Sequence, residues 1–174
     1  RFDQTIMIAK KLNVKTIVFH SGFDAFDRRF YTDRDFIRSF IENQVQFWSE
    51  YIQKLDNTDI IAVLENTSER NPDILPEIVD RVGSKNLKLC IDTGHVNHKT
   101  DFTVSEWIKR TGKHLHYMHL HNNYKLFDEH NSLLRGSINF TEVFQTLVEQ
   151  NLQPGLSLEI HRYSPSMESL DFIK

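Results

Sequence analysis

The sequence of 174 residues contains one cysteine, six glycines and four prolines, and these shortages exclude several classes of protein. Because Cys90 stands alone, no disulfide can form within the chain, which agrees with a reducing compartment and leads us to expect a cytoplasmic protein. No glycine- or proline-rich linker interrupts the chain, so we expect residues 1–174 to form a single domain. No apolar run approaches the roughly 20 residues that a membrane helix needs, so no membrane contact is expected.

An excess of charge of one sign is also missing. The chain has 21 Lys plus Arg against 24 Asp plus Glu, and it lacks a block of basic residues, so nucleic acid is not expected as a partner. Neither glycine-rich nucleotide-binding motif occurs, and no Ser or Cys has the neighbours of an acyl-transfer nucleophile. The chain begins at Arg1 without a methionine or a signal segment, and we expect this start to be a cut.

Short apolar runs alternate with helical patterns along the chain. The apolar, β-branched runs predict buried strands at 16–20, 60–65, 87–92, 115–121 and 156–160. Helical periodicity predicts helices at 3–12, 35–55, 72–82, 104–111 and 140–150. This alternation is typical of parallel βαβ units. The segments 21–31 and 122–137 are expected to be irregular, and both follow a strand's C-terminal end, where such folds keep their function.

Each predicted strand ends in a side chain that can bind a metal or move a proton. These side chains are His20, Glu65, Asp92, His119 with His121, and Glu159. Because side chains alternate along a strand, His119 and His121 share a face, and such faces converge at one mouth if the sheet curves. Taken singly, a glutamate there is more often a cap or an ion-pair partner, and a histidine is more often a core residue. Five coincidences at the same end favour one shared site.

The chemistry of these residue types suits a divalent cation. Two glutamates, an aspartate and a histidine supply oxygen and nitrogen donors, in the manner of catalytic metal sites with an open position. A cation held this way polarises a carbonyl or lowers the pKa of bound water. Carboxylates beyond those that neutralise the metal can move protons. The pattern therefore predicts an enzyme with a bound divalent metal ion, which would be Mn, Mg, Co or Zn.

Six short motifs occur in order along the chain. They are V-F-H-S-G at 18–22, L-E-N-T at 64–67, C-I-D-T-G-H at 90–95, M-H-L-H-N-N at 118–123, D-E-H at 128–130 and L-S-L-E at 156–159. Together they resemble the xylose isomerase-like TIM barrel superfamily, which includes sugar phosphate isomerases/epimerases and endonuclease IV-type abasic-site endonucleases. The resemblance covers nearly the whole chain and implies an α/β fold, the (β/α)8 TIM barrel. A complete barrel takes roughly 250 residues and eight strands, so we expect about strands 4 to 8, with N-terminal units missing and an open half-barrel sheet.

The resemblance also implies roles for individual residues. The family's metal site would fall on Glu65, Asp92, His119 and Glu159, with His121 as the competitor for His119. Glu65 and Glu159 would be the catalytic acid/base pair, which moves a proton through a metal-stabilised enediolate, and His95 would bind a substrate hydroxyl. The expected function is that of a divalent-metal-dependent sugar or sugar phosphate isomerase/epimerase of carbohydrate metabolism, with a small-molecule sugar as partner.

Two alternatives accompany this expectation. An abasic-site endonuclease holds three zinc ions, and its additional ligands would match His20, His95, Asp128 and His130. Its pattern has glycines after E-N-T and a Gly-x-Gly after D-x-H, whereas this chain has 68–72 without glycine and a single Gly136. The D-T-G-H string resembles the uncharacterised sugar isomerase members more closely. The other alternative is a non-catalytic ligand-binding barrel. A homo-oligomer is left open in each case.

Overall fold

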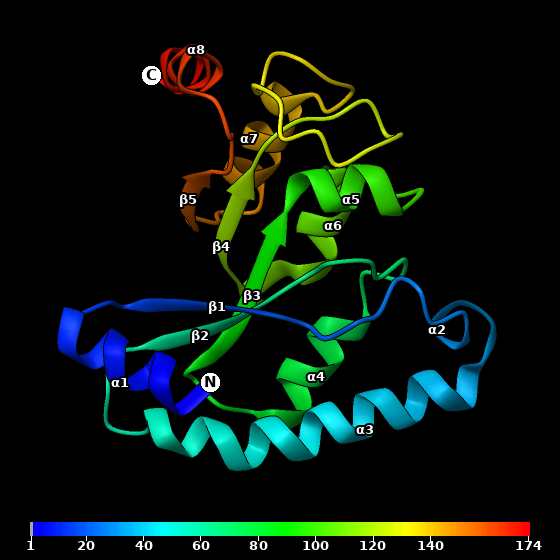
Figure 1. The fold of residues 1–174 in the computed structure, drawn as a ribbon, viewed down its shortest axis with the longest axis vertical. Coiled ribbons are helices and arrows are strands. Elements are labelled where there is room, and N and C mark those ends of the chain that lie inside the picture. The colour runs from blue at the N-terminus through cyan, green and yellow to red at the C-terminus, as the bar shows by residue number, and fades with distance from the viewer. Residues whose placement is uncertain (1) are drawn as a thin grey trace.

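A single five-stranded sheet forms the centre of the computed structural model, which describes residues 2–174 (Figure 1). All neighbouring strands are parallel and follow one another in chain order. They are β1 (Thr16–His20), β2 (Ile61–Glu65), β3 (Leu87–Asp92), β4 (Leu115–Leu120) and β5 (Gly155–Leu158). Their order and the twist from β1 to β5 make a curved half-barrel, which confirms the predicted partial TIM barrel.

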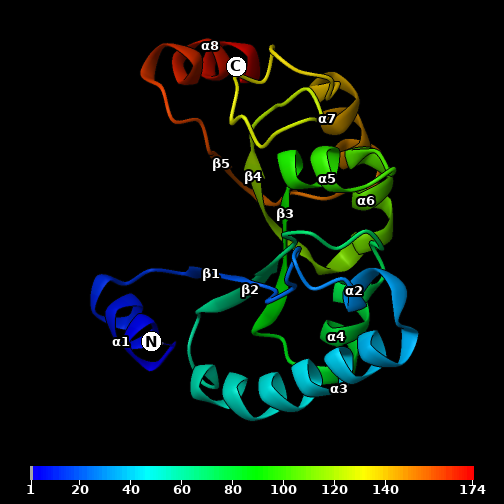
Figure 2. The same ribbon diagram turned by 45° about the vertical axis from the view of Figure 1, so that its right-hand side comes forward.

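Helices connect successive strands and cover one face of the sheet (Figures 1 and 2). Five helices agree closely with the predicted ones: α1 (Phe2–Leu12), which precedes β1, and the connecting helices α3 (Arg34–Tyr51), α4 (Ile74–Val82), α6 (Val104–Thr111) and α7 (Phe140–Glu149). Short 3-10 turns, η1 (Ile52–Leu55) and η2 (Gly112–His114), follow α3 and α6. Three helices were not predicted: α2 (Arg29–Thr32), α5 (Thr93–Lys99) and α8 (Tyr163–Ile173). Among the helices of residues 2–174, none combines the length and apolar character needed to cross a bilayer.

Side-chain caps fix where several helices begin. Asp33 accepts hydrogen bonds from the backbone N–H groups of Asp35 and Phe36 at the start of α3. Thr103 and Glu106 form a reciprocal capping box on α6. The helix α4 ends at Gly83, whose φ of 67° is the left-handed conformation that glycine adopts without strain. These residues fix the ends of the helices that connect the strands.

Strand register decides which side chains face the helices and which face the concave side. The core lies under the helices and includes alternate strand residues such as Leu64, Ile91 and Met118, which are at most 1% exposed. Their neighbours in sequence point the other way. On that concave face His20 pairs with Glu65, and Asp92 pairs with His119. The sheet thus gathers its polar strand ends on its concave, C-terminal side.

Candidate metal centre

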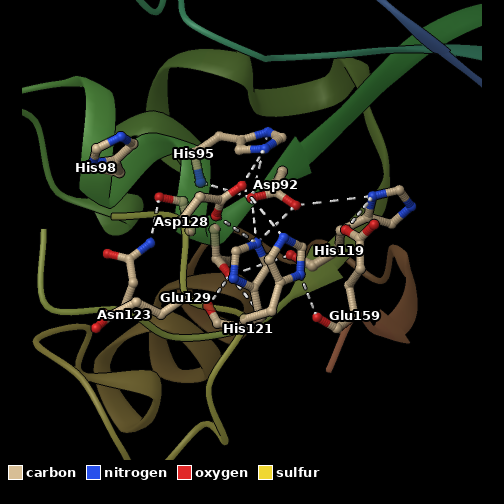
Figure 3. A network of polar contacts seen from close by, with 12 residues as sticks. Asp92, His95, His98, His119, His121, Asn123, Asp128, Glu129 and Glu159 are labelled. Atoms are coloured by element: carbon tan, nitrogen blue, oxygen red, sulfur yellow. Dashed lines mark hydrogen bonds and ion pairs between the residues drawn. The ribbon is translucent and has the colours of Figure 1, made fainter. Parts of the chain in front are cut away.

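Four of the predicted site residues lie together at the C-terminal mouth of the sheet, and Figure 3 labels three of them, Asp92, His119 and Glu159. Glu65, Asp92, His119 and Glu159 each offer one ligand atom, and these atoms all lie within 4.8 Å of one another. The first three end β2 and β3 or lie next to the end of β4, and Glu159 directly follows β5, where its N–H donates to the carbonyl of Leu120. Four strands therefore deliver one donor each to the same point.

One imidazole nitrogen of this cluster sits among three carboxylates. His119 Nδ1 lies 3.2 Å from Glu65 Oε1 and 3.2 Å from Glu159 Oε2. The hydrogen bond to Glu65 raises the pKa of His119. Burial, together with neighbouring Asp92, raises the pKa of Glu159 because crowded carboxylates resist ionisation. Glu65 and Asp92 are themselves almost fully buried. The cluster carries more negative charge than its one histidine can balance, which is what a divalent cation would neutralise.

His95 lies beside this cluster in the first turn of α5. Its backbone N–H donates to Asp92 Oδ1 at 2.7 Å, and its ring Nδ1–H donates to the carbonyl oxygen of Asn66 at 2.9 Å. The other ring nitrogen is 3.3 Å from Asp128 Oδ2. Burial lowers the pKa of His95, but the contacts with Asp128 and Asp92 outweigh it and hold the pKa at about 9. Without a bound metal, His95 is therefore a cation at neutral pH.

A second donor cluster adjoins the first and consists of His121, Asp128 and His130. The rings of His121 and His130 stack with centroids 3.9 Å apart, and His130 Nε2 lies 3.3 Å from Asp128 Oδ2. His121 Nε2–H donates to Asp92 Oδ1 at 3.0 Å. Burial acts to raise the pKa of Asp92, but the bond from His121 and the charge of His95 outweigh it and lower that pKa. The structure thus places the two competitors differently: His119 lies in the first cluster, and His121 joins the second through its contact with Asp92.

His20 lies at the edge of the site. Its side chain is 72% exposed, and its Nε2 is 3.6 Å from Glu65 Oε2. It borders the first cluster through that one carboxylate.

Two buried residues that the sequence did not single out hold the strand ends in register. The Asn66 side chain accepts from the N–H of Asp92 and donates to its carbonyl, which fastens β2 to β3. The Thr93 hydroxyl lies between the carbonyls of His119 and His121 and accepts from the N–H of His121. Asn66 belongs to the E-N-T motif and Thr93 to the D-T-G-H motif. In the sequence, each could have been found as a polar residue that directly follows a strand-end carboxylate.

A comparison with known families identifies the fold of this site. The model of the family described as xylose isomerase-like TIM barrel matches residues 1–174. The chain belongs to this family.

Individual proteins resemble the chain over much of its length. The uncharacterised protein MJ1311 of Methanocaldococcus jannaschii is 28% identical over 149 residues, which make up 80% of this chain and 50% of that protein. A D-tagatose 3-epimerase-like protein has a TM-score of 0.81 and 25% identity, covering 97% of this chain and 64% of its own. The TTHB071 protein from Thermus thermophilus, solved after soaking with ZnCl2, has a TM-score of 0.77 and 20% identity over 99% of this chain and 65% of its own. The chain thus spans between half and two thirds of the length of these proteins.

Replacing Asp128 by asparagine is expected to lower the pKa of His95 from about 9 by about one unit or more, because the substitution removes a charge-assisted contact at 3.3 Å. Titration of the histidine ring protons by NMR in metal-free protein measures this shift. Asp101→Asn, in an exposed turn, is the matched control. An unchanged His95 pKa would show that Asp92 and the carbonyl of Asn66 are sufficient to hold the proton.

Replacing Gly94 by alanine is expected to destabilise the fold. A Cβ at this position would overlap the buried imidazole ring of His121. Overpacking of this kind costs about 1–3 kcal/mol of unfolding free energy, which urea denaturation measures. In the double variant Gly94→Ala/His121→Ala the clash is absent. Its loss of unfolding free energy should therefore be smaller than the sum of the losses in the two single variants. Additive losses would mean that Gly94 matters for a reason other than the approach of His121.

Proposed function

We propose that the protein is a divalent-metal-dependent sugar or sugar phosphate isomerase/epimerase. The observation that carries the proposal is the meeting of two glutamates, Glu65 and Glu159, at one donor cluster, where each lies 3.2 Å from His119. Removal of a carbon-bound proton needs a general base, and its return to the opposite face needs a second group, so two glutamates at one cluster can serve either proton exchange or epimerisation. The similarity to a D-tagatose 3-epimerase-like protein supports the same reaction class.

The first cluster fits a divalent metal ion. Glu65, Asp92, His119 and Glu159 would hold it, and this mixture of carboxylate and imidazole donors suits Mn, Mg, Co or Zn. The surplus of carboxylates explains why the site needs a cation to be electrostatically balanced. The ZnCl2 soak of the related fold supports a metal of this class. When bound, the ion would polarise the substrate's carbonyl and make the adjacent carbon-bound proton acidic.

The protein's own residues would then move the proton. Glu159 is half-buried, and burial together with Asp92 raises its pKa in the metal-free protein, which makes its carboxylate a stronger base. Glu65, which is 3% exposed, would face it across the substrate. His95, whose Nδ1–H is held by the carbonyl of Asn66, would offer a substrate oxygen the Nε2–H that contacts Asp128 in the metal-free protein. The site would perform a proton transfer from carbon, whether its outcome is isomerisation or epimerisation.

The test is solvent exchange at carbon. The protein loaded with manganese is incubated with tagatose, fructose or their terminal phosphate esters in deuterium oxide, and deuterium uptake next to the carbonyl is followed by NMR. Uptake that disappears with a chelator and returns with the metal supports the proposal. Metal and sugar binding without any uptake would favour a non-catalytic ligand-binding barrel.

A zinc-dependent abasic-site endonuclease is the second candidate, and the second donor cluster favours it. His121, Asp128 and His130 lie together beside the first cluster, and His95 contacts Asp128. An arrangement of this kind suits several metal ions held side by side. Incorporation of about three zinc ions per chain, with cleavage of a duplex that carries one abasic site, would replace the isomerase proposal. About one exchangeable ion and no cleavage would exclude the nuclease.

A further inference from the structure

A separate cavity of about 270 Å³ is lined entirely by loop and helix residues outside the strands. It is lined by residues of three segments that follow β1, β2 and β3, namely Ala25, Tyr31, Ser68, Arg70, His98 and Lys99. None of these residues belongs to either donor cluster. Because all three segments follow strand C-terminal ends, the cavity lies on the functional side of the sheet, where a ligand that spans several loops can reach it.

The lining is cationic and lacks a carboxylate. Within residues 2–174, neither Arg70 nor Lys99 has a carboxylate within ion-pair distance. The Arg70 guanidinium lies 4.5 Å over the ring of Tyr31, and stacking of this kind leaves the N–H groups at its edge free to donate. The neighbouring Glu69 is buried, its Oε2 accepts from the N–H groups of Thr67 and Ser68, and burial raises its pKa, which favours the uncharged acid.

Neutral donors complete the lining. Burial raises the pKa of Tyr31 above its usual range, although Arg70 acts to lower it, so the phenol keeps its proton. The buried Ser68 contributes a hydroxyl group. His98 Nδ1–H donates to the carbonyl of Lys125 at 2.7 Å, which fixes the ring against that loop. Two cations with two neutral hydroxyl donors, Tyr31 and Ser68, form a composition that recognises a phosphate group.

The helix α5 sets the spacing between this cavity and the metal centre. Its cap, Asp92, is part of the first cluster, and its last residues are His98 and Lys99 (Figure 3 draws His95 and His98 in relation to Asp92). Seven residues of α-helix extend about 10 Å along the axis. This is comparable with the length of an extended pentose or hexose phosphate, so one ligand can reach both places.

We propose that this cavity is an anion subsite that binds the terminal phosphate of a sugar phosphate whose carbonyl end lies at the metal centre. The inference rests on the proposed function and deepens it, because it assigns the substrate to the phosphorylated sugars. Arg70 and Lys99 neutralise the phosphate, and the hydroxyl groups of Tyr31 and Ser68 are positioned to orient it by hydrogen bonds. The subsite acts by placing the substrate and takes no part in the proton transfer.

The test uses inorganic phosphate first. Its binding to metal-free protein is followed by phosphorus NMR at low ionic strength, so that no bound metal competes for it. Saturable binding is expected, and Arg70→Gln or Lys99→Gln should weaken it about tenfold, the loss of one charge-assisted hydrogen bond. Tyr31→Phe, which keeps the ring under Arg70, should weaken it less. Arg38→Gln is the control, since Arg38 is exposed on α3 and outside the cavity. Absence of saturable binding, or equal binding by wild type and Arg70→Gln, would overturn the proposal.

A second measurement tests the subsite independently of the proposed reaction, and it distinguishes a sugar phosphate from the phosphate groups of a nucleic acid. Fructose and its terminal phosphate ester are compared as ligands, and Arg70→Gln should remove the preference for the ester without changing the affinity for fructose. Phosphate binding that persists while deuterium exchange fails in every metal-loaded preparation would reject the proposed function alone. Exchange that proceeds equally on both ligands, unaffected by Arg70→Gln, would reject the subsite alone. A short oligonucleotide that competes more strongly than the sugar ester would also overturn the assignment.

Discussion

Glu159→Gln is expected to abolish the exchange of the substrate's carbon-bound proton with solvent. The amide keeps the shape of the side chain and its contact with His119, but it cannot accept a proton, and general-base catalysis contributes about 10²–10⁴ in rate. The raised pKa of the Glu159 carboxyl, caused by burial and by Asp92, is the property that the substitution removes. Deuterium uptake in the manganese-loaded variant, measured beside wild type, checks the expected loss.

The interpretation depends on metal still being bound, so the metal content of each preparation is measured together with the rate. Glu149→Gln, at the exposed end of α7, is the matched control and should exchange like wild type. Asp92→Asn should lose exchange together with its metal, whereas Glu159→Gln with full metal and no exchange identifies a proton-transfer role. Retained exchange in metal-loaded Glu159→Gln would contradict the role that we assign to this residue.

The strands and most helices could be predicted because their signals are local. The run at 16–20 matches β1, and the periodic aromatic pattern at 35–55 matches α3 with η1. The helix α5 was missed because it starts directly at a strand end and carries Gly94 in its first turn, a residue that disfavours helices. Tertiary contact decides there, since only a glycine leaves room for the His121 ring. The helix α8 was missed because its apolar face is weakly marked and only Ser169 is buried.

The position of the candidate site at the strand ends could be predicted from the sequence, but its division into two donor clusters could not. Alternation along parallel strands is enough to bring Glu65, Asp92 and His119 to one face. The same alternation cannot distinguish His119 from His121, because both point the same way. The difference arises after β4 ends at Leu120, where the Thr93 hydroxyl holds the backbone and turns the His121 ring onto Asp92. The contact between Thr93 and His121 joins residues 28 positions apart, so no periodic pattern in the sequence reveals it.

Addition of a divalent metal is expected to stabilise the folded protein, and Asp92→Asn is expected to remove this effect. A ligand at a hundredfold excess over its Kd adds about 2.7 kcal/mol to the unfolding free energy. For a chain of this size that corresponds to an increase in Tm of about 5–10 °C, measured by calorimetry with and without metal. Asp56→Asn, an exposed substitution after η1, is the control and should keep the increase. An equal increase in Asp92→Asn would place the metal outside the first cluster.

The stabilisation should fall as the pH is lowered, and the direction follows from the ligands. The pKa of His119 is raised by its hydrogen bond to Glu65, and the pKa of Glu159 is raised by burial and by Asp92. Both groups must release a proton before they can bind a cation. In metal-free protein they hold these protons up to a higher pH than ordinary histidine and glutamate do, so protons compete with the metal over a wider range. The increase in Tm with metal should therefore be largest above the raised pKa of His119 and shrink steadily as the pH falls below it. A metal effect independent of pH would mean that neither His119 nor Glu159 is a ligand, because their protons would then have nothing to compete with.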